Sequence, residues 1–249
     1  MTEQGIKQSL DMTRVMFSRG NISEKIRFGK VVNEGDKVLD MYTGIGYYTL
    51  PALIHGRASY VFACEWNEHA IRALRYNIQD NHVEDRVTVL DGDCRVSAEE
   101  NNLVDMFDRV SLGLLPSSEG GWKTAVRALK RSTGGWLHVH ANVPEKEIRI
   151  WTFWLCRSLL NLVQEEQLSD EWVVLCEYVE RVKSFAPTVS HYVADVFVGP
   201  ASGFPRNTGP LGSRAGIFEA GELISCPSDV QVPSCALSPD GVLCQEWMR

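Results

Sequence analysis

Short apolar runs alternate with amphipathic segments along most of the chain, a pattern typical of a parallel sheet covered by helices. Five apolar runs bounded by turn residues predict strands, and two longer runs that follow predict a pair of adjacent strands. This order predicts an α/β fold with a mostly parallel seven-stranded sheet and an antiparallel hairpin at one edge. The strands are expected at residues 37–41, 60–65, 86–90, 108–112, 136–141, 171–183 and 189–198.

Segments with apolar residues at helical spacing lie between these runs. Asn67 is a favourable N-cap for the clearest of them, which places Ala70, Leu74 and Ile78 on one face. Ser23 is expected to cap a helix over residues 24–32. Residues 5–18 are interpreted as extended, and the stretch before residue 108 as a polar connection. Further helices are expected over residues 47–54, 119–130 and from 144 to about 164.

The first two strands frame a turn that contains two glycines. The first strand ends in Asp40, the sequence Thr43-Gly44-Ile45-Gly46 follows, and Glu65 ends the second strand 19 residues after Gly46. Glycines let the backbone turn sharply and let a ligand approach without meeting a Cβ atom. Free N–H groups at the start of the next helix favour polar or negative ligand groups, and a carboxylate at the second strand end accepts from ribose hydroxyls. The order predicts an adenosine site.

The same turn departs from a dinucleotide motif at one position. Thr49 stands where a third glycine is expected after Gly44 and Gly46. A turn with two glycines is also common as a purely structural element, so that interpretation stays open beside adenosine binding.

Composition restricts the class of protein. A chain of 249 residues with 44% hydrophobic and 23% charged residues is long enough for one α/β domain with a full core. Seven cysteines without a C-x-x-C pair indicate free thiols in a reducing compartment, and we expect a cytoplasmic protein. No apolar run is long enough to cross a bilayer. The net charge of −7 does not favour a general nucleic-acid binder, so any RNA contact requires a local basic patch or another domain.

Four motifs together resemble one family of transferases. They are residues 16–25 (MFSRGNISEK), 42–51 (YTGIGYYTLP), 64–67 (CEWN) and 182–187 (VKSFAP). The chain resembles the class I S-adenosylmethionine-dependent transferases with a Rossmann-like fold. Within them it is similar to the wybutosine-synthesizing protein 2 family, aminocarboxypropyl transferases of tRNA-Phe related to the tRNA guanine-N1 methyltransferases. The resemblance covers about residues 5–199 and implies S-adenosylmethionine as co-substrate.

The resemblance also implies roles for residues around the glycine turn. Ser18 and Lys25 are expected to contact the amino-acid end of S-adenosylmethionine, and a lysine ammonium is suited to a carboxylate. A solvated helix lysine is the alternative for Lys25. Glu65 is expected to hold the ribose, with a surface acid as its alternative. Asp40, Gly44 and Gly46 complete this part of the predicted cofactor site.

Two further stretches follow the third and fourth strands. Asp93 is expected to accept from the adenine amine and Cys94 to offer its backbone N–H to the ring, although relatives usually carry Asn at the latter position. A turn-forming aspartate is the alternative for Asp93. Pro116, Ser117 and Ser118 lie where the transferred group is expected and are candidates for substrate binding, with helix capping as the alternative for the serines.

By this resemblance, the protein transfers the 3-amino-3-carboxypropyl group of S-adenosylmethionine to the wyosine-type base beside the anticodon of tRNA-Phe. The sulfonium is already electrophilic, so catalysis is mainly positioning and no catalytic side chain is expected. Two alternatives stay open: a tRNA guanine-N1 methyltransferase, and an inactive cofactor-binding isoform. Family members carry an N-terminal RNA-binding portion, so tRNA binding by this monomer is expected to be weak or absent without it.

The remaining patterns have structural interpretations as defaults. His138 and His140 are expected to be satisfied core histidines rather than metal ligands. Lys123, Arg127, Lys130 and Arg131 form a basic stripe that either contacts tRNA phosphate or is a solvated face. We expect an N-terminal segment and entry helix over residues 1–35, a catalytic domain over 36–199 and a disordered tail over 200–249, whose cysteines 226, 235 and 244 are spaced by chance.

Overall fold

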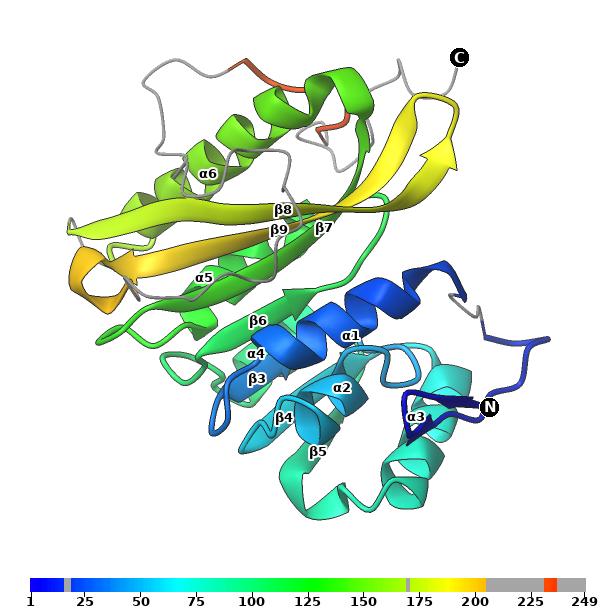
Figure 1. Cartoon of the computed structure of the whole chain (residues 1–249). Helices are drawn as coiled ribbons and strands as arrows, with labels where there is room; N and C mark the ends of the chain where they lie inside the picture. The colour runs from blue at the N-terminus through cyan, green and yellow to red at the C-terminus, as the bar shows by residue number, and fades with distance from the viewer. Residues whose placement is uncertain (16–18, 169–170, 205–230, 237–249) are drawn as a thin grey trace. The chain divides into compact units, whose positions relative to one another are not determined.

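The computed structural model describes residues 1–15, 19–168, 171–204 and 231–236 (Figure 1). The chain divides into two compact units, Met1–Gly113 and Leu114–Arg249. Ser18 and most of the predicted tail, residues 205–230 and 237–249, lie outside the described residues.

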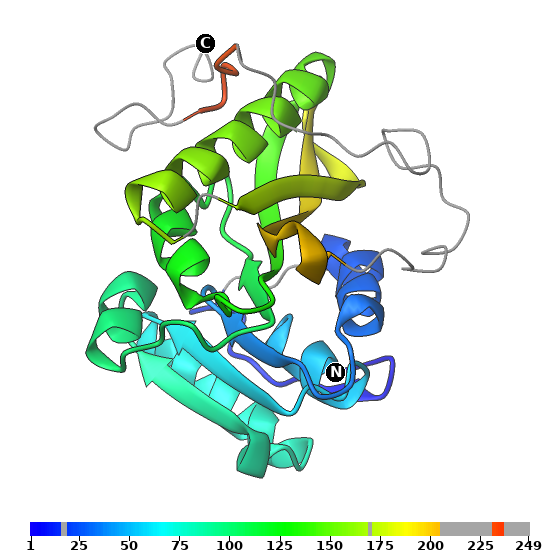
Figure 2. The ribbon, with the colours of Figure 1, turned by 90° about the vertical axis from the view of Figure 1, so that its left-hand side faces the viewer.

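The first unit is built on a parallel four-stranded sheet with the order β5-β4-β3-β6. Figure 2 shows these strands fanned side by side, coloured from blue to green. A short antiparallel hairpin, β1 and β2, precedes them. The strands are β1 (Thr2–Glu3), β2 (Ile6–Lys7), β3 (Lys37–Asp40), β4 (Tyr60–Glu65), β5 (Val87–Asp91) and β6 (Arg109–Leu112), and the helices are α1 (Ile22–Val31), α2 (Thr49–Ile54), α3 (Glu68–Asp80) and α4 (Cys94–Glu100).

The core of this unit explains why its strands are nearly continuous apolar runs. Val38 and Leu39 point to opposite faces of β3, and both are fully buried. A strand covered on both faces loses the alternation of apolar and polar positions. Leu50 of α2 and Leu74 of α3 are also fully buried and pack with Val38 in one hydrophobic cluster. At the carboxyl ends of β3 and β4 the sheet carries the polar residues Asp40 and Glu65.

The second unit is an antiparallel sheet with the order β7-β9-β8. Its strands are β7 (Gly135–Pro144), β8 (Trp172–Ala186) and β9 (Val189–Pro200), and its helices are α5 (Trp122–Ala128) and α6 (Ile148–Glu165). α6 packs on β8 and buries Trp151, Leu155 and Leu159. The predicted hairpin is confirmed, and β9 is antiparallel to both of its neighbours because it lies between them. Among the described residues, no helix has the length and apolar character needed to span a membrane.

Several predicted element boundaries are wrong. α1 begins at Ile22, with Asn21 rather than Ser23 in the N-cap position and without a side-chain capping bond. The second helix begins at Thr49 because the glycine turn continues through Tyr48. Pro144 ends β7 instead of opening a helix, and α6 starts after a short 3₁₀ turn.

Two segments were given the wrong type of structure. The stretch after the third strand contains α4, where a polar connection was predicted. The N-terminal stretch, predicted as extended over residues 5–18, has a strand at Ile6–Lys7 but turns at residues 12–14. Before it, Glu3 pairs with Ile6 across a tight turn at Gln4 and Gly5. This places Glu3 where it contacts α1, as described below.

Candidate functional site

The glycine turn after β3 requires glycine at both predicted positions. Gly44 has φ of 58° and Gly46 has φ of 101°, in the region that side chains other than glycine rarely adopt. A Cβ atom at Gly44 would lie 2.9 Å from the Tyr47 ring, and one at Gly46 would lie 3.0 Å from Leu50. A side chain at either position would therefore strain the backbone and collide with a neighbouring side chain.

Thr49 explains why this turn dispenses with a third glycine. Its hydroxyl donates to Asp40 Oδ2 at 2.8 Å and lies 2.7 Å from the hydroxyl of Thr43. All three residues are fully buried. Burial raises the pKa of Asp40 to about 6, against hydrogen bonds from Thr49, Thr43 and Ser111 that lower it. Asp40 thus lies beneath the turn and ties β3 to the start of α2.

Glu65 joins the turn to the start of α3. Its Oε2 accepts from the Gly44 N–H at 2.8 Å, and its Oε1 accepts from the N–H groups of Trp66 at 3.0 Å and Asn67 at 2.9 Å. A carboxylate has about four lone-pair positions, so these bonds leave about one, on Oε2, for a ligand. Glu65 and the glycine turn are therefore brought together as predicted, with capacity for one ribose hydroxyl rather than two.

Asp93 is the N-cap of α4. Its carboxylate accepts from the backbone N–H of Arg95 at 2.9 Å and from the Arg95 guanidinium at 2.5 Å. The hydrogen bonds from Arg95 hold the pKa of Asp93 below its usual value. Cys94 is buried, and burial raises the pKa of its thiol to about 11, so this thiol is not a nucleophile at neutral pH. Asp93 thus caps α4 through these contacts. Its contact with adenine stays a prediction.

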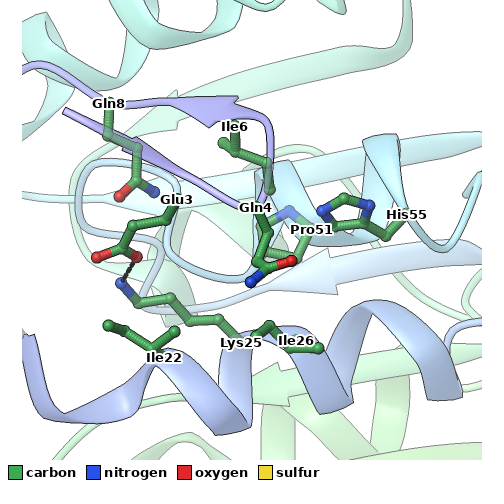
Figure 3. A pocket seen from close by; sticks show the side chains of 9 residues that line it. All are labelled: Glu3, Gln4, Ile6, Gln8, Ile22, Lys25, Ile26, Pro51 and His55. Carbon is green, nitrogen blue, oxygen red and sulfur yellow. Dashed lines mark hydrogen bonds and ion pairs between the residues drawn. The ribbon is translucent and has the colours of Figure 1, made fainter.

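Lys25 is not a solvated helix lysine. Only 5% of it is exposed, its ammonium lies 2.8 Å from Glu3 Oε2, and it stands 4.9 Å from the centroid of the Tyr47 ring. Figure 3 shows the Lys25 side chain directed at Glu3 in a hollow between α1 and the N-terminal hairpin. Lys25 therefore already holds a carboxylate, of the kind that the amino-acid end of a ligand would offer.

The predicted substrate loop lies in the second unit. Ser117 Oγ donates to Glu119 Oε1 at 2.9 Å and accepts from the Glu119 N–H at 3.3 Å. Ser118 is 1% exposed and accepts from the Trp122 indole N–H at 3.2 Å. The Pro116 carbonyl accepts from the Asn142 N–H at 2.9 Å, which fixes the loop to β7. Both serine hydroxyls thus have local structural partners, so their role in substrate binding stays a prediction.

The patterns interpreted as structural are mostly paired within the second unit. His138 lies 2.6 Å from Asp195, and His140 lies 3.0 Å from His191, with all four side chains buried. The prediction of core histidines is confirmed. In the basic stripe, Lys123 and Arg127 both contact Glu166, at 2.5 and 3.5 Å.

Known proteins match the chain in sequence and in structure. The TRM5/TYW2 methyltransferase domain matches residues 1–153. A tRNA wybutosine-synthesizing protein 2/3/4 of Oryza sativa subsp. japonica is 48% identical over 194 residues, which are 78% of this chain and 18% of the relative.

Two solved archaeal structures superpose well on the chain. P. horikoshii TYW2 in complex with MeSAdo is 30% identical with a TM-score of 0.69, over 79% of this chain and 69% of that one. M. jannaschii TYW2 in complex with AdoMet is 29% identical with a TM-score of 0.69, over 79% and 84%. They confirm the predicted Rossmann-like fold of S-adenosylmethionine-dependent transferases. The chain spans about a fifth of its rice relative, and it belongs to the TRM5/TYW2 methyltransferase domain family.

Proposed function

We propose that the chain binds S-adenosylmethionine at the glycine turn and transfers its 3-amino-3-carboxypropyl group to the wyosine-type base of tRNA-Phe. The observation that carries the proposal is the contact of Glu65 with the Gly44 N–H, at a turn whose two glycines have positive φ. The names of the relatives support it, because they include wybutosine-synthesizing proteins and a TYW2 structure with AdoMet.

The residues of the first unit fit this ligand. Glu65 keeps about one acceptor position for a ribose hydroxyl, and the adenosine is proposed to lie against the turn at Gly44 and Gly46. Asp93 and the Cys94 N–H are proposed to meet the adenine. Lys25, with Ser18, is proposed to take the methionine carboxylate, which requires Lys25 to exchange its bond with Glu3 for one to the ligand.

The main contribution of the chain to this reaction is to orient S-adenosylmethionine and the base. The bound sulfonium supplies an electrophilic Cγ, the attacking carbon of the base forms the new bond as the Cγ–S bond breaks, and the base then releases a proton to water. Within the described residues, the turn offers backbone N–H groups and carboxylates rather than a nucleophile, since Cys94 is buried with a raised pKa. Holding Cγ in line with the base is the contribution that remains.

The wider setting follows from the same proposal. We propose a monomeric cytoplasmic enzyme whose catalytic domain spans residues 36–199, with Pro116, Ser117 and Ser118 near the base. Free thiols at all five described cysteines fit a reducing compartment. tRNA-Phe is the proposed partner, bound weakly unless a further RNA-binding domain takes part.

The decisive experiment is product analysis with S-adenosylmethionine labelled in its carboxypropyl chain and tRNA-Phe that carries the wyosine precursor. We expect label in the tRNA and methylthioadenosine in solution. S-adenosylhomocysteine with unlabelled tRNA would identify a guanine-N1 methyltransferase instead, and cofactor binding without tRNA binding would identify a cofactor-binding protein. Glu65→Ala is expected to weaken S-adenosylmethionine binding at least tenfold, because it removes a charge-assisted acceptor of ribose.

A further inference from the structure

A groove runs along α3 in the first unit, outside the proposed cofactor turn. It has a volume of about 750 Å³ and lies between α3 and residues 9–14 of the N-terminal segment. Arg14 comes from the segment, and His69, Arg72 and Tyr76 come from two successive turns of α3. The first α3 residue that lines the groove, His69, follows Glu65 by four residues in the sequence.

The wall of the groove is held in place by α3 itself. Asn77 accepts from the Ser9 N–H at 2.7 Å and donates to the Ile45 carbonyl at 3.0 Å. Asn81, one turn further, accepts from the Lys7 N–H at 2.9 Å and donates to the Lys7 carbonyl at 2.7 Å. These bonds fix the extended segment to the helix and to the glycine turn. The groove is therefore part of the folded unit and needs no ligand to form.

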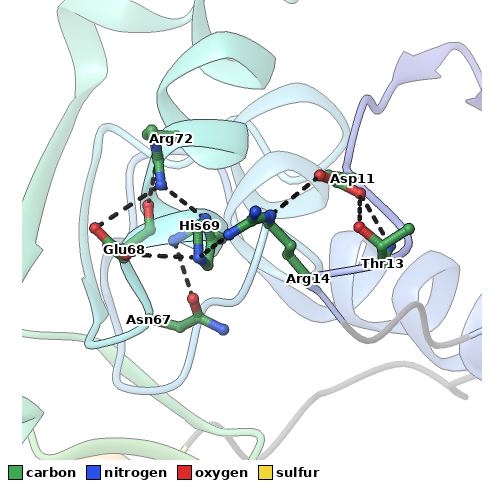
Figure 4. A network of polar contacts seen from close by, with 7 residues as sticks. All are labelled: Asp11, Thr13, Arg14, Asn67, Glu68, His69 and Arg72. Atoms are coloured by element: carbon green, nitrogen blue, oxygen red, sulfur yellow. Dashed lines mark hydrogen bonds and ion pairs between the residues drawn. The ribbon is translucent and has the colours of Figure 1, made fainter.

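Two guanidinium groups converge on one imidazole in this groove, as Figure 4 shows. Arg72 Nη2 lies 2.7 Å from His69 Nδ1, and Arg14 Nη1 lies 3.3 Å from His69 Nε2. An imidazole accepts at one nitrogen when neutral and at none when protonated, whereas a guanidinium only donates. His69 therefore cannot accept from both arginines. In at least one of the two contacts, an arginine N–H therefore faces an N–H of His69. An anion with several oxygens would accept from these donors.

The acids beside these donors lie at ion-pair distance, beyond hydrogen-bond length. Asp11 Oδ2 lies 3.8 Å from Arg14, and its Oδ1 accepts from the N–H and hydroxyl of Thr13 at 2.9 and 2.6 Å. Glu68 lies 3.5 Å from His69 and 3.8 Å from Arg72, and its side chain is 79% exposed. Such exposed pairs contribute little and are readily exchanged. Arg14 and Arg72 themselves are 59% and 67% exposed.

We propose that this groove binds the phosphodiester backbone of RNA, with Arg14, His69 and Arg72 donating to phosphate oxygens. Tyr76, 55% exposed one turn beyond Arg72, offers a ring on which a base stacks. Arginine donors beside an aromatic side chain are a usual arrangement for single-stranded nucleic acid. Asp11 and Glu68 balance the formal charge of Arg14 and Arg72, so the groove offers converging donors rather than a net positive charge. The identity of the RNA as tRNA rests on the proposed function.

The test compares the wild-type full chain with three variants, Arg14→Gln, Arg72→Gln and the control Arg75→Gln. Arg75 is also exposed on α3, at 56%, but it contacts Asp91 at 2.9 Å and does not line the groove. We expect the first two to weaken binding of tRNA-Phe transcript about five- to tenfold near 0.1 M salt, and each to lower the salt slope by about one. The control is expected to match the wild type.

Measurements on the same samples separate the possible outcomes. Equal RNA affinity in all four proteins would overturn the groove, as would a wild-type chain that binds no RNA. If inorganic phosphate binding depends on Arg14 but RNA affinity does not, the groove is a small-anion site and the proposal is overturned as well. S-adenosylmethionine affinity should be the same in all four proteins. If the wild type does not bind S-adenosylmethionine, the proposed function is wrong. The comparison of the arginine variants would still show whether the groove binds RNA.

Discussion

The two units place their buried polar groups differently. In the first unit, Asp40 and Glu65 lie at the carboxyl ends of β3 and β4, where backbone N–H groups or hydroxyls donate to them. In the second unit, His138, His191 and Asp195 lie within long strands and contact other side chains of the same sheet. Strand-end groups border the turns and helix starts that follow the strands, whereas groups within a strand are enclosed by their neighbours.

This difference separates residues that a ligand can reach from residues that only stabilise the fold. Parallel strands end together, so their terminal side chains form a cluster at one edge. The antiparallel register places His138 opposite Asp195 and Asn142 opposite His191, so polar side chains inside the sheet face one another across the strands. Substitutions in the second unit should therefore change stability, and those at the turn should change ligand binding.

The largest expected effect comes from Asp195→Ala. The substitution leaves His138 buried without the carboxylate 2.6 Å away, and loss of one member of a buried pair typically destabilises by about 3–5 kcal/mol. Urea unfolding should show this loss, with S-adenosylmethionine affinity of the folded fraction unchanged. Asp91→Ala is the control, because its pair with Arg75 is exposed and should change stability by less than about 1 kcal/mol. Equal losses would remove the distinction between enclosed and exposed pairs.

The two units should also respond to pH with opposite signs. Burial raises the pKa of Asp40 from 3.8 to about 6, so its contribution to stability is present below pH 3.8 and is lost as the pH rises through 6. Burial, with repulsion from Lys183, lowers the pKa of His191 from 6.5 to about 4, so its contribution is present above pH 6.5 and is lost as the pH falls to 4. Each shift corresponds to about 3 kcal/mol.

The contributions of Asp40 and His191 to the pH dependence of stability have opposite signs, so each is measured with a variant that removes one group. Between pH 4 and 6.5, the unfolding free energy of Asp40→Asn relative to wild type should rise with pH, and that of His191→Gln should fall. Urea unfolding at four or five pH values measures both differences. Differences of the same sign would mean that one of the two groups is not buried as described.

A smaller effect is expected at the glycine turn. Gly46→Ala forces a side chain into φ of 101° and brings its Cβ to 3.0 Å from Leu50, so we expect a loss of about 2 kcal/mol and weaker S-adenosylmethionine binding. Gly35→Ala is matched in backbone conformation, with φ of 90°, but its Cβ would meet nothing within 4 Å. It should show the backbone strain alone and keep full ligand affinity. Loss of affinity in both variants would point to general destabilisation.

The sequence predicted the parts of the fold that local signals determine. The strand Tyr60–Glu65 has the expected bounds because turn residues enclose its apolar run, and Asn67 caps α3 with a 2.9 Å bond to the His69 N–H. α4 was missed because its seven residues are too few and too polar to show a helical stripe. A start signal was present in Asp93, an N-cap residue that was interpreted as a ligand contact or a turn-forming aspartate.

Contacts between distant residues could not be read from the sequence. The bond of Thr49 to Asp40 exists only once β3 and α2 meet, so the absent third glycine looked like a defect. The pairing of Lys25 with Glu3, 22 residues away, could not be predicted because it forms only through the N-terminal hairpin. Such pairings depend on how the chain folds back on itself. The spacing of residues along the sequence does not predict which distant side chains meet.

The smallest expected effect distinguishes capping from ligand binding at Asp93. Asn caps a helix about as well as Asp, and the pair with Arg95 is exposed, so Asp93→Asn should change the unfolding free energy by less than about 1 kcal/mol. Asp93→Ala removes the cap and should destabilise by about 1 kcal/mol. If the carboxylate accepts from the adenine amine, both variants should weaken S-adenosylmethionine binding, in calorimetry, more than Arg95→Gln. A loss of affinity that follows stability across the three variants would leave Asp93 as a cap alone.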